Sequence, residues 1–130
     1  MLEIQAVVSV LAQAPAPPTA AADTIEGEWK IEIVDNIRIM PDAAVTMTFR
    51  GGRVSGFASC NTFQGEFTAR GGALTTSNLL TTMKACDGPR MSQERDFLAL
   101  LRAATNYERR NDDTLVLTTA LGKSMRASRK

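Results

Sequence analysis

From Thr24 onward, apolar and polar residues alternate along the chain. A period of two is typical of β-strands that have one buried and one exposed face. In the first run, Trp29, Ile31 and Ile33 fall on the same face, and the alternation returns over residues 45–49. The pattern therefore predicts half-buried antiparallel strands over most of the chain.

Short turn sequences separate these runs. Gly51-Gly52 and Gly71-Gly72 each lie between two alternating segments, and such pairs favour tight hairpins because glycine accepts a positive φ. Residues 111–113 (Asn-Asp-Asp) and 121–123 (Leu-Gly-Lys) predict two further turns. We therefore expect consecutive strands that are joined by short connections.

One segment breaks the period of two. Between Pro89 and Ala104 the apolar residues recur at helical spacing, and proline suits the first turn of a helix. The apolar stripe comprises Met91, Phe97, Leu98, Leu101 and Ala104; the exposed face comprises Glu94, Arg95, Asp96 and Arg102. A single helix with one apolar stripe must bury it on a sheet. The sequence predicts an α+β, mainly β fold, in which a curved antiparallel sheet or partly open barrel wraps around one α-helix.

The first 23 residues differ from the rest of the chain. Residues 1–22 are rich in alanine and proline with Glu3 as their only charge, and residues 4–12 have the length and apolarity of a signal-peptide core. No lysine or arginine precedes this apolar run, so a linker or an ordered arm is the alternative. We divide the chain into a signal-peptide-like or Ala/Pro-rich segment, 1–23, and one domain, 24–130.

The composition argues against several classes of function. The chain has 15 Lys and Arg against 14 Asp and Glu, a net charge of +1, so we expect no nucleic-acid partner. It has no histidine, which removes the commonest general base and the commonest zinc ligand. Its two cysteines are too few for a four-thiolate zinc site. We expect no enzymatic activity, no metal and no cofactor.

Several short motifs follow one another in a recognisable order. They are Gly27-Glu28-Trp29, a Gly-x-x-x-Cys-Asn-x-Phe-x-Gly segment from Gly56 to Gly65 with Cys60-Asn61 at its centre, Thr-x-x-x-Cys from Thr82 to Cys86, and Glu-x-x-Phe-Leu from Glu94 to Leu98. This order resembles the META domain family, whose bacterial members include heat-inducible HslJ-like envelope proteins. The chain departs from the family pattern at Ser59, where glycine is usual.

The resemblance implies an extracytoplasmic domain, periplasmic or secreted, with a sheet around a helix and no established enzymatic activity. Family members are linked to stress tolerance and to surface or secretion phenotypes. The fold is similar to that of the lipid-binding pilotins of type III secretion. From this resemblance we expect an envelope stress-protection or protein-interaction module, with a lipid or apolar-peptide binder as the alternative.

Cys60 and Cys86 have three interpretations. In an exported domain, two lone cysteines favour a disulfide. Free buried thiols are the second interpretation. A redox or metal site is the third, because Lys84 and the following helix start would lower a thiol pKa. We expect the disulfide, and we treat Gly56, Asn61, Gly65 and Thr82 as motif and turn residues around it.

The remaining candidates each have a structural explanation. Trp29 lies on the apolar face of its strand, so core packing is favoured over a ligand platform. The acids Asp87, Glu94 and Asp96 surround a helix start, where the helix dipole accounts for negative charge. The basic C-terminus (Lys123, Arg126, Arg129 and Lys130) fits a solvated edge strand better than a membrane contact.

If the domain carries an apolar ligand, a cleft between sheet and helix must hold it. Trp29, Phe49, Phe63 and Met83 are the residues that we expect to wall such a cleft. The partner is then either an apolar ligand or another protein, and we expect a monomer.

Overall fold

The computed structural model describes residues 25–130. The predicted signal-peptide-like segment lies outside them. The strands are β1 (Gly27–Val34), β2 (Ile37–Arg38), β3 (Thr46–Arg50), β4 (Arg53–Phe57), β5 (Thr62–Arg70), β6 (Ala73–Thr81), β7 (Ala104–Asn111), β8 (Thr114–Thr119) and β9 (Ser124–Arg129). The helix, α3 (Gly88–Ala103), connects β6 to β7.

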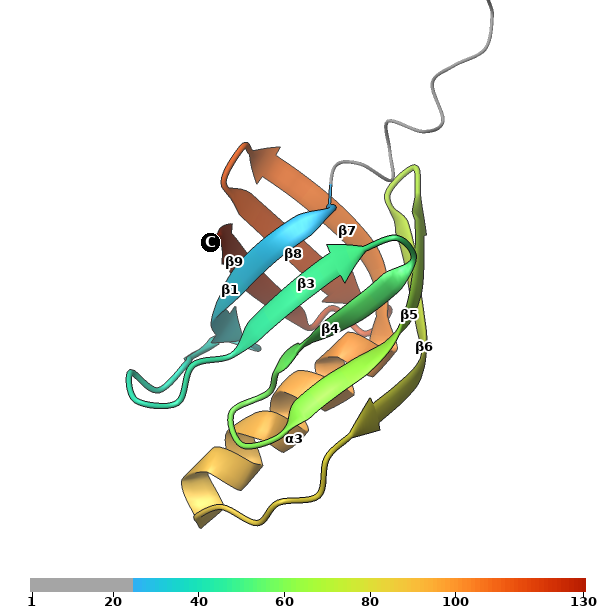
Figure 1. Ribbon diagram of the computed structural model, residues 1–130. Coiled ribbons are helices and arrows are strands. Elements are labelled where there is room, and N and C mark those ends of the chain that lie inside the picture. The colour runs from blue at the N-terminus through green and yellow to red at the C-terminus, as the bar shows by residue number, and fades with distance from the viewer. Residues whose placement is uncertain (1–24) are drawn as a thin grey trace, which may run out of the picture.

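The nine strands form one antiparallel sheet in the order β2-β1-β3-β4-β5-β6-β7-β8-β9, and β1 also pairs with β9. This last pairing closes the sheet into a barrel of eight strands (Figure 1). The short β2 pairs with β1 alone and is attached outside the ring. The predicted mainly β fold with one helix is confirmed. The expected edge position of the basic C-terminal strand is wrong, because β9 pairs with β8 on one side and β1 on the other.

The first strand contains an irregularity that alters its buried face. The register of β1 against β9 shifts between Ile31 and Ile33, as expected where a bulge inserts one extra residue. Trp29, Ile31 and Val34 are therefore buried, whereas Ile33 is only half-buried. The prediction that Ile33 shares the face of Trp29 is wrong for this reason.

The helix packs at the lower end of the barrel in Figure 1. Phe97 and Leu101 are fully buried, and the Phe97 ring meets that of Phe63 edge to face at 5.4 Å between centroids. Thr76 Oγ1 donates to the carbonyl oxygen of Leu101 at 3.0 Å, which ties β6 to the helix end. The helix is neither long nor apolar enough to cross a membrane, and the described residues include no helix that is.

Trp29 is a fully buried member of the barrel core. Its side chain is completely buried, and its Nε1 donates to the carbonyl oxygen of Ile25 at 2.9 Å. The guanidinium of Arg129 lies 4.2 Å from the ring centroid, a distance at which the cation is attracted to the π face. Core packing of Trp29 is confirmed.

Candidate functional site

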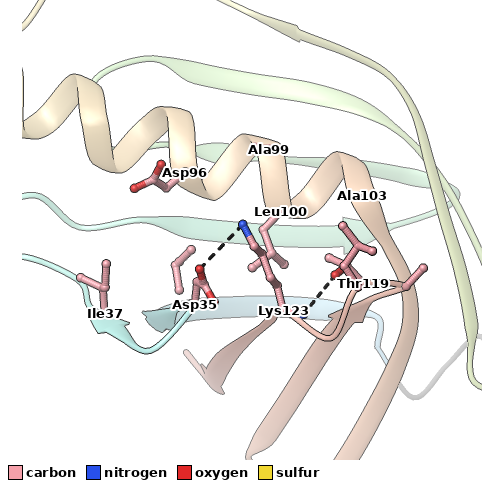
Figure 2. Close-up of a pocket in the computed structure, with 11 residues that line it drawn as sticks. Asp35, Ile37, Asp96, Ala99, Leu100, Ala103, Thr119 and Lys123 are labelled. Carbon is pink, nitrogen blue, oxygen red and sulfur yellow. Dashed lines mark hydrogen bonds and ion pairs between the residues drawn. The ribbon is translucent and has the colours of Figure 1, made fainter.

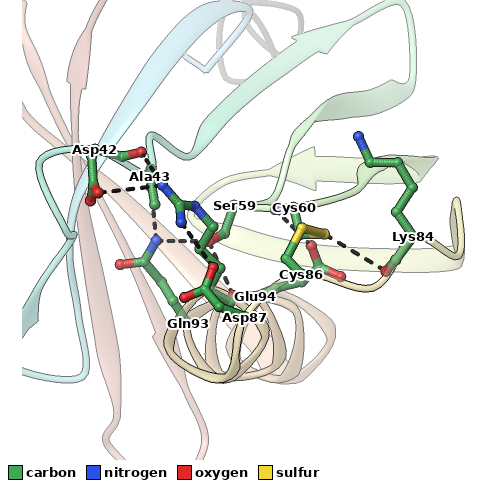
Figure 3. Close-up of polar contacts among 10 residues, drawn as sticks. Asp42, Ala43, Ser59, Cys60, Lys84, Cys86, Asp87, Gln93 and Glu94 are labelled. Carbon is green, nitrogen blue, oxygen red and sulfur yellow. Dashed lines mark hydrogen bonds and ion pairs between the residues drawn. A yellow bond between two sulfur atoms is a disulfide. The ribbon is translucent and has the colours of Figure 1, made fainter.

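The two cysteine motifs meet beside the start of the helix. Cys60 lies in the connection between β4 and β5, Cys86 lies between β6 and α3, and the two form the predicted disulfide (Figure 3). Cys60 Sγ is also 3.7 Å from the carbonyl oxygen of Lys84. A disulfide sulfur carries no proton, so this is a packing contact.

Glu94 joins the helix to this cysteine connection. The backbone N–H groups of Cys60 and Asn61 donate to its Oε1 at 3.1 and 2.7 Å, and the Asn61 side chain donates Nδ2–H to its Oε2 at 2.8 Å. Glu94 is only 6% exposed. The expectation that Glu94 lies on the wet face of the helix is wrong, because its carboxylate satisfies three donors of a buried turn.

Asn61 extends the same network to the segment before the helix. Its Oδ1 accepts from Thr82 Oγ1 at 2.8 Å and from the backbone N–H of Lys84 at 2.6 Å. The motif residues Cys60, Asn61, Thr82 and Glu94 therefore hold β5, the linker and α3 together. We call this set the cysteine clamp.

Ser59, at the position where the family resemblance leads us to expect glycine, has a backbone conformation that favours glycine. Its φ is 100°, a value that favours glycine. Its hydroxyl donates to the carbonyl oxygen of Arg90 at 3.1 Å and accepts from Gln93 Nε2 at 3.0 Å. These two bonds to the first turns of the helix offset the cost of the strained backbone.

The motif glycines permit close packing of backbone. A Cβ at Gly56 would clash with the carbonyl oxygen of Thr46, and one at Gly65 would lie 2.9 Å from that of Ser77. Within residues 25–130, every buried side-chain N or O atom has a hydrogen-bond partner. The buried polar groups of the cysteine clamp are thus all engaged within the fold, as expected for a structural role.

Replacing Glu94 with glutamine tests the clamp. The new amide nitrogen will face either Asn61 Nδ2 or the backbone donors of the turn, and one donor will lose its acceptor. We expect the free energy of unfolding in urea to fall by about 1 to 2 kcal/mol. The control is Asp96→Asn, at an exposed position of the same helix. It should change the free energy of unfolding by less than about 0.5 kcal/mol.

The other acids at the helix start do not form a site. Asp87 is the N-cap residue, but its side chain makes no capping bond and accepts instead from Arg90 Nη1 at 2.8 Å. The hydrogen bond from Arg90 lowers the pKa of Asp87. The acids therefore separate into a buried clamp residue, an ion-paired residue and the exposed Asp96.

The four residues predicted to wall a cleft do not face one space. Trp29 and Phe49 are completely buried and Phe63 is 3% exposed, all three in the continuous core of the barrel. Met83 is 89% exposed. An apolar hollow does lie beside the helix, but other residues line it.

This hollow, which we call the helix groove, has a volume of about 400 Å³ and lies between α3 and two hairpin turns (Figure 2). Ala99, Leu100 and Ala103 form its helix side. Ile37 is 65% exposed and Leu121 is 89% exposed at its margins. The other lining residues are Val34, Asp35, Asp96, Thr119, Ala120 and Lys123.

The groove follows from local sequence on both sides. Asp35 and Asn36 have φ values of 49° and 68°, as in a type I′ turn, and this turn folds β2 back onto β1. On the helix side, the small side chains of Ala99 and Ala103 leave space that larger side chains would fill. The pair Asp35-Asn36 between two apolar runs is the sequence signal for this hairpin, which is not among the turns predicted above.

Charged groups line one rim of the groove. Lys123 Nζ lies 4.0 Å from Asp35 Oδ2 (Figure 2). Asp96 lies on the helix side, so the lining carries two carboxylates and one ammonium. A second hollow of about 220 Å³ continues along the helix toward Pro89 and shares Val34, Ile37 and Asp96 with the first.

Comparisons with known proteins agree with this architecture. The META domain family model matches residues 22–130. No curated protein sequence matches the chain significantly. An NMR structure of a protein from Burkholderia xenovorans superposes with a TM-score of 0.69 at 23% identity, covering 90% of this chain and 92% of that one. A crystal structure of a DUF4847 family protein from Bacteroides vulgatus superposes with a TM-score of 0.63 at 16% identity, covering 82% and 93%. At these identities the likeness concerns the fold.

Proposed function

The chain belongs to the META domain family, and on that premise we propose that it is a non-enzymatic interaction module of the cell envelope whose helix groove takes an apolar segment of a partner protein. The observation that carries this proposal is the pair of exposed apolar side chains at the groove margins, Ile37 and Leu121. Exposed apolar residues gathered around a hollow are typical of binding surfaces.

Charge favours a peptide over a fatty acid as the occupant. The only ammonium that lines the groove, Lys123, is already paired with Asp35, and Asp96 adds a second negative charge. A fatty-acid carboxylate at this rim would meet like charges. A segment with an apolar side chain next to a lysine or arginine would bury the first and pair the second with Asp96.

The disulfide is compatible with an oxidising, extracytoplasmic compartment. We propose a periplasmic or secreted location, where a monomeric domain of this kind would assist envelope proteins under stress. The runner-up function is an apolar carrier of the pilotin type, and the apolar lining of the groove is the observation that favours it.

Substitution of Leu121 tests the groove. We expect Leu121→Ser to weaken binding of a fluorescent peptide with alternating leucine and lysine by about tenfold, because one apolar contact of about 1.5 kcal/mol is lost. Fluorescence anisotropy measures the affinity. Met83→Ser is a matched control, since Met83 and Leu121 are both 89% exposed and Met83 does not line the groove.

Two companion probes separate the alternatives. A peptide with glutamate in place of lysine should bind more weakly, because Asp96 would repel it. The carrier function would be favoured over the interaction module if a fluorescent fatty acid bound more tightly than either peptide and if Leu121→Ser weakened its binding by the same factor. Equal effects of Leu121→Ser and Met83→Ser would contradict both functions.

A further inference from the structure

A third hollow lies on the other side of the β2–β3 connection. It has a volume of about 410 Å³ and is lined by Lys30, Glu32, Arg38 and Arg126 together with the apolar residues Ile31, Ile39, Met40, Pro41 and Ala44. We call it the basic hollow. It shares no residue with the helix groove.

Strand register brings the two arginines together. Ile33 of β1 is opposite Arg38 on β2 and opposite Arg126 on β9. Side chains of directly opposed residues project from the same face of a sheet. Arg38 and Arg126 therefore flank the half-buried Ile33 on the outer face, which is where the β1 bulge places it.

The basic hollow has an excess of positive charge. Glu32 is the only acid that lines it, and this carboxylate is already engaged: Oε1 is 3.6 Å from Arg126 Nε and Oε2 accepts from Ser128 Oγ at 2.9 Å. Among residues 25–130, neither Lys30 nor Arg38 forms an ion pair. Three cations against one anion leave a net charge of +2, in a chain whose total is +1.

We propose that the basic hollow binds a phosphate group. Guanidinium groups match phosphate oxygens with two parallel hydrogen bonds, and a phosphate monoester carries close to two negative charges at neutral pH. It would therefore neutralise the hollow, whereas a single carboxylate would not. The apolar wall of Ile39, Met40 and Pro41 suits the organic group to which the phosphate is attached. This site shares no lining residue with the helix groove itself, although Arg38, Ile39 and Met40 also line the smaller hollow that continues the groove.

Titration of the full chain with inorganic phosphate tests the site. We expect saturable shifts of the backbone NMR signals of Lys30, Arg38 and Arg126, beyond those that chloride causes at equal ionic strength. Arg38→Gln should weaken binding by about tenfold, equivalent to about 1.4 kcal/mol. Arg50→Gln, at an exposed position outside the hollow, should leave the affinity for phosphate unchanged. Shifts that chloride reproduces, or an equal loss in both variants, would overturn the proposal.

Two further arms identify the source of the phosphate. Co-sedimentation with vesicles that contain phosphatidic acid, whose headgroup is a phosphate monoester, would assign the site to a lipid headgroup if Arg38→Gln abolishes it and Arg50→Gln does not. Tighter binding of glycerol phosphate than of inorganic phosphate, without vesicle binding, would assign it to a soluble phosphate ester. Neither result affects the peptide assay with Leu121→Ser. The two experiments therefore test the phosphate site and the peptide groove separately.

Discussion

Replacing Phe97 with alanine is expected to lower the free energy of unfolding by about 3 to 5 kcal/mol. The side chain is completely buried and contacts Phe63 across the junction of helix and barrel. Its removal forfeits the burial of a ring and leaves a cavity that a closed barrel cannot collapse to fill. Urea unfolding provides the measurement.

Leu121→Ala is the control for this experiment, because it also shortens an apolar side chain but one that is 89% exposed. Leu121→Ala should change the free energy of unfolding by no more than about 0.5 kcal/mol. Leu101→Ala, at a second fully buried helix position, should cost about 2 to 5 kcal/mol. A loss below about 1 kcal/mol for Phe97→Ala would mean that the helix does not anchor on the barrel.

Removing the disulfide is the second large change. The bond joins residues 26 apart in sequence, and closing a loop of this length stabilises a fold by roughly 3 to 4 kcal/mol in the chain-entropy picture. The double variant Cys60→Ser, Cys86→Ser should show this loss in urea. Reductant should destabilise the parent protein by a similar amount and leave the double variant unchanged.

Intact-mass measurement after alkylation without reductant checks that the bond forms in protein taken from an oxidising compartment. No thiol should be alkylated. Two alkylated thiols would favour the alternative of free buried cysteines, and the clamp would then depend on the hydrogen bonds of Glu94, Asn61 and Thr82.

Much of the fold was predictable because it depends on local patterns. The glycine pairs at 51–52 and 71–72 produce the expected hairpins, and the single break in the alternation marks the helix. The closure of the barrel was not predictable, because it depends on β1 pairing with β9 across nearly the whole domain. No local pattern encodes which strands meet at such a separation.

The site was less predictable for two physical reasons. A one-residue bulge in β1 moves Ile33 to the outer face, and periodicity alone does not indicate where such an insertion occurs. Glu94 looks like a surface residue by its charge, but its burial depends on donors from a turn more than thirty residues away. The cysteine motifs correctly located a cluster of interacting residues, but this cluster stabilises the fold, and the groove lies elsewhere.

Trp29 has a consequence for how the protein can be studied by spectroscopy. It is the only tryptophan, its indole is sealed from solvent and bonded to Ile25, and neither the helix groove nor the basic hollow is lined by it. Its emission should therefore report the integrity of the barrel, moving to longer wavelength in urea. Occupancy of either hollow should leave that emission unchanged. Intrinsic fluorescence is thus a clean measure of folding for every variant above, and binding requires a signal carried by the ligand.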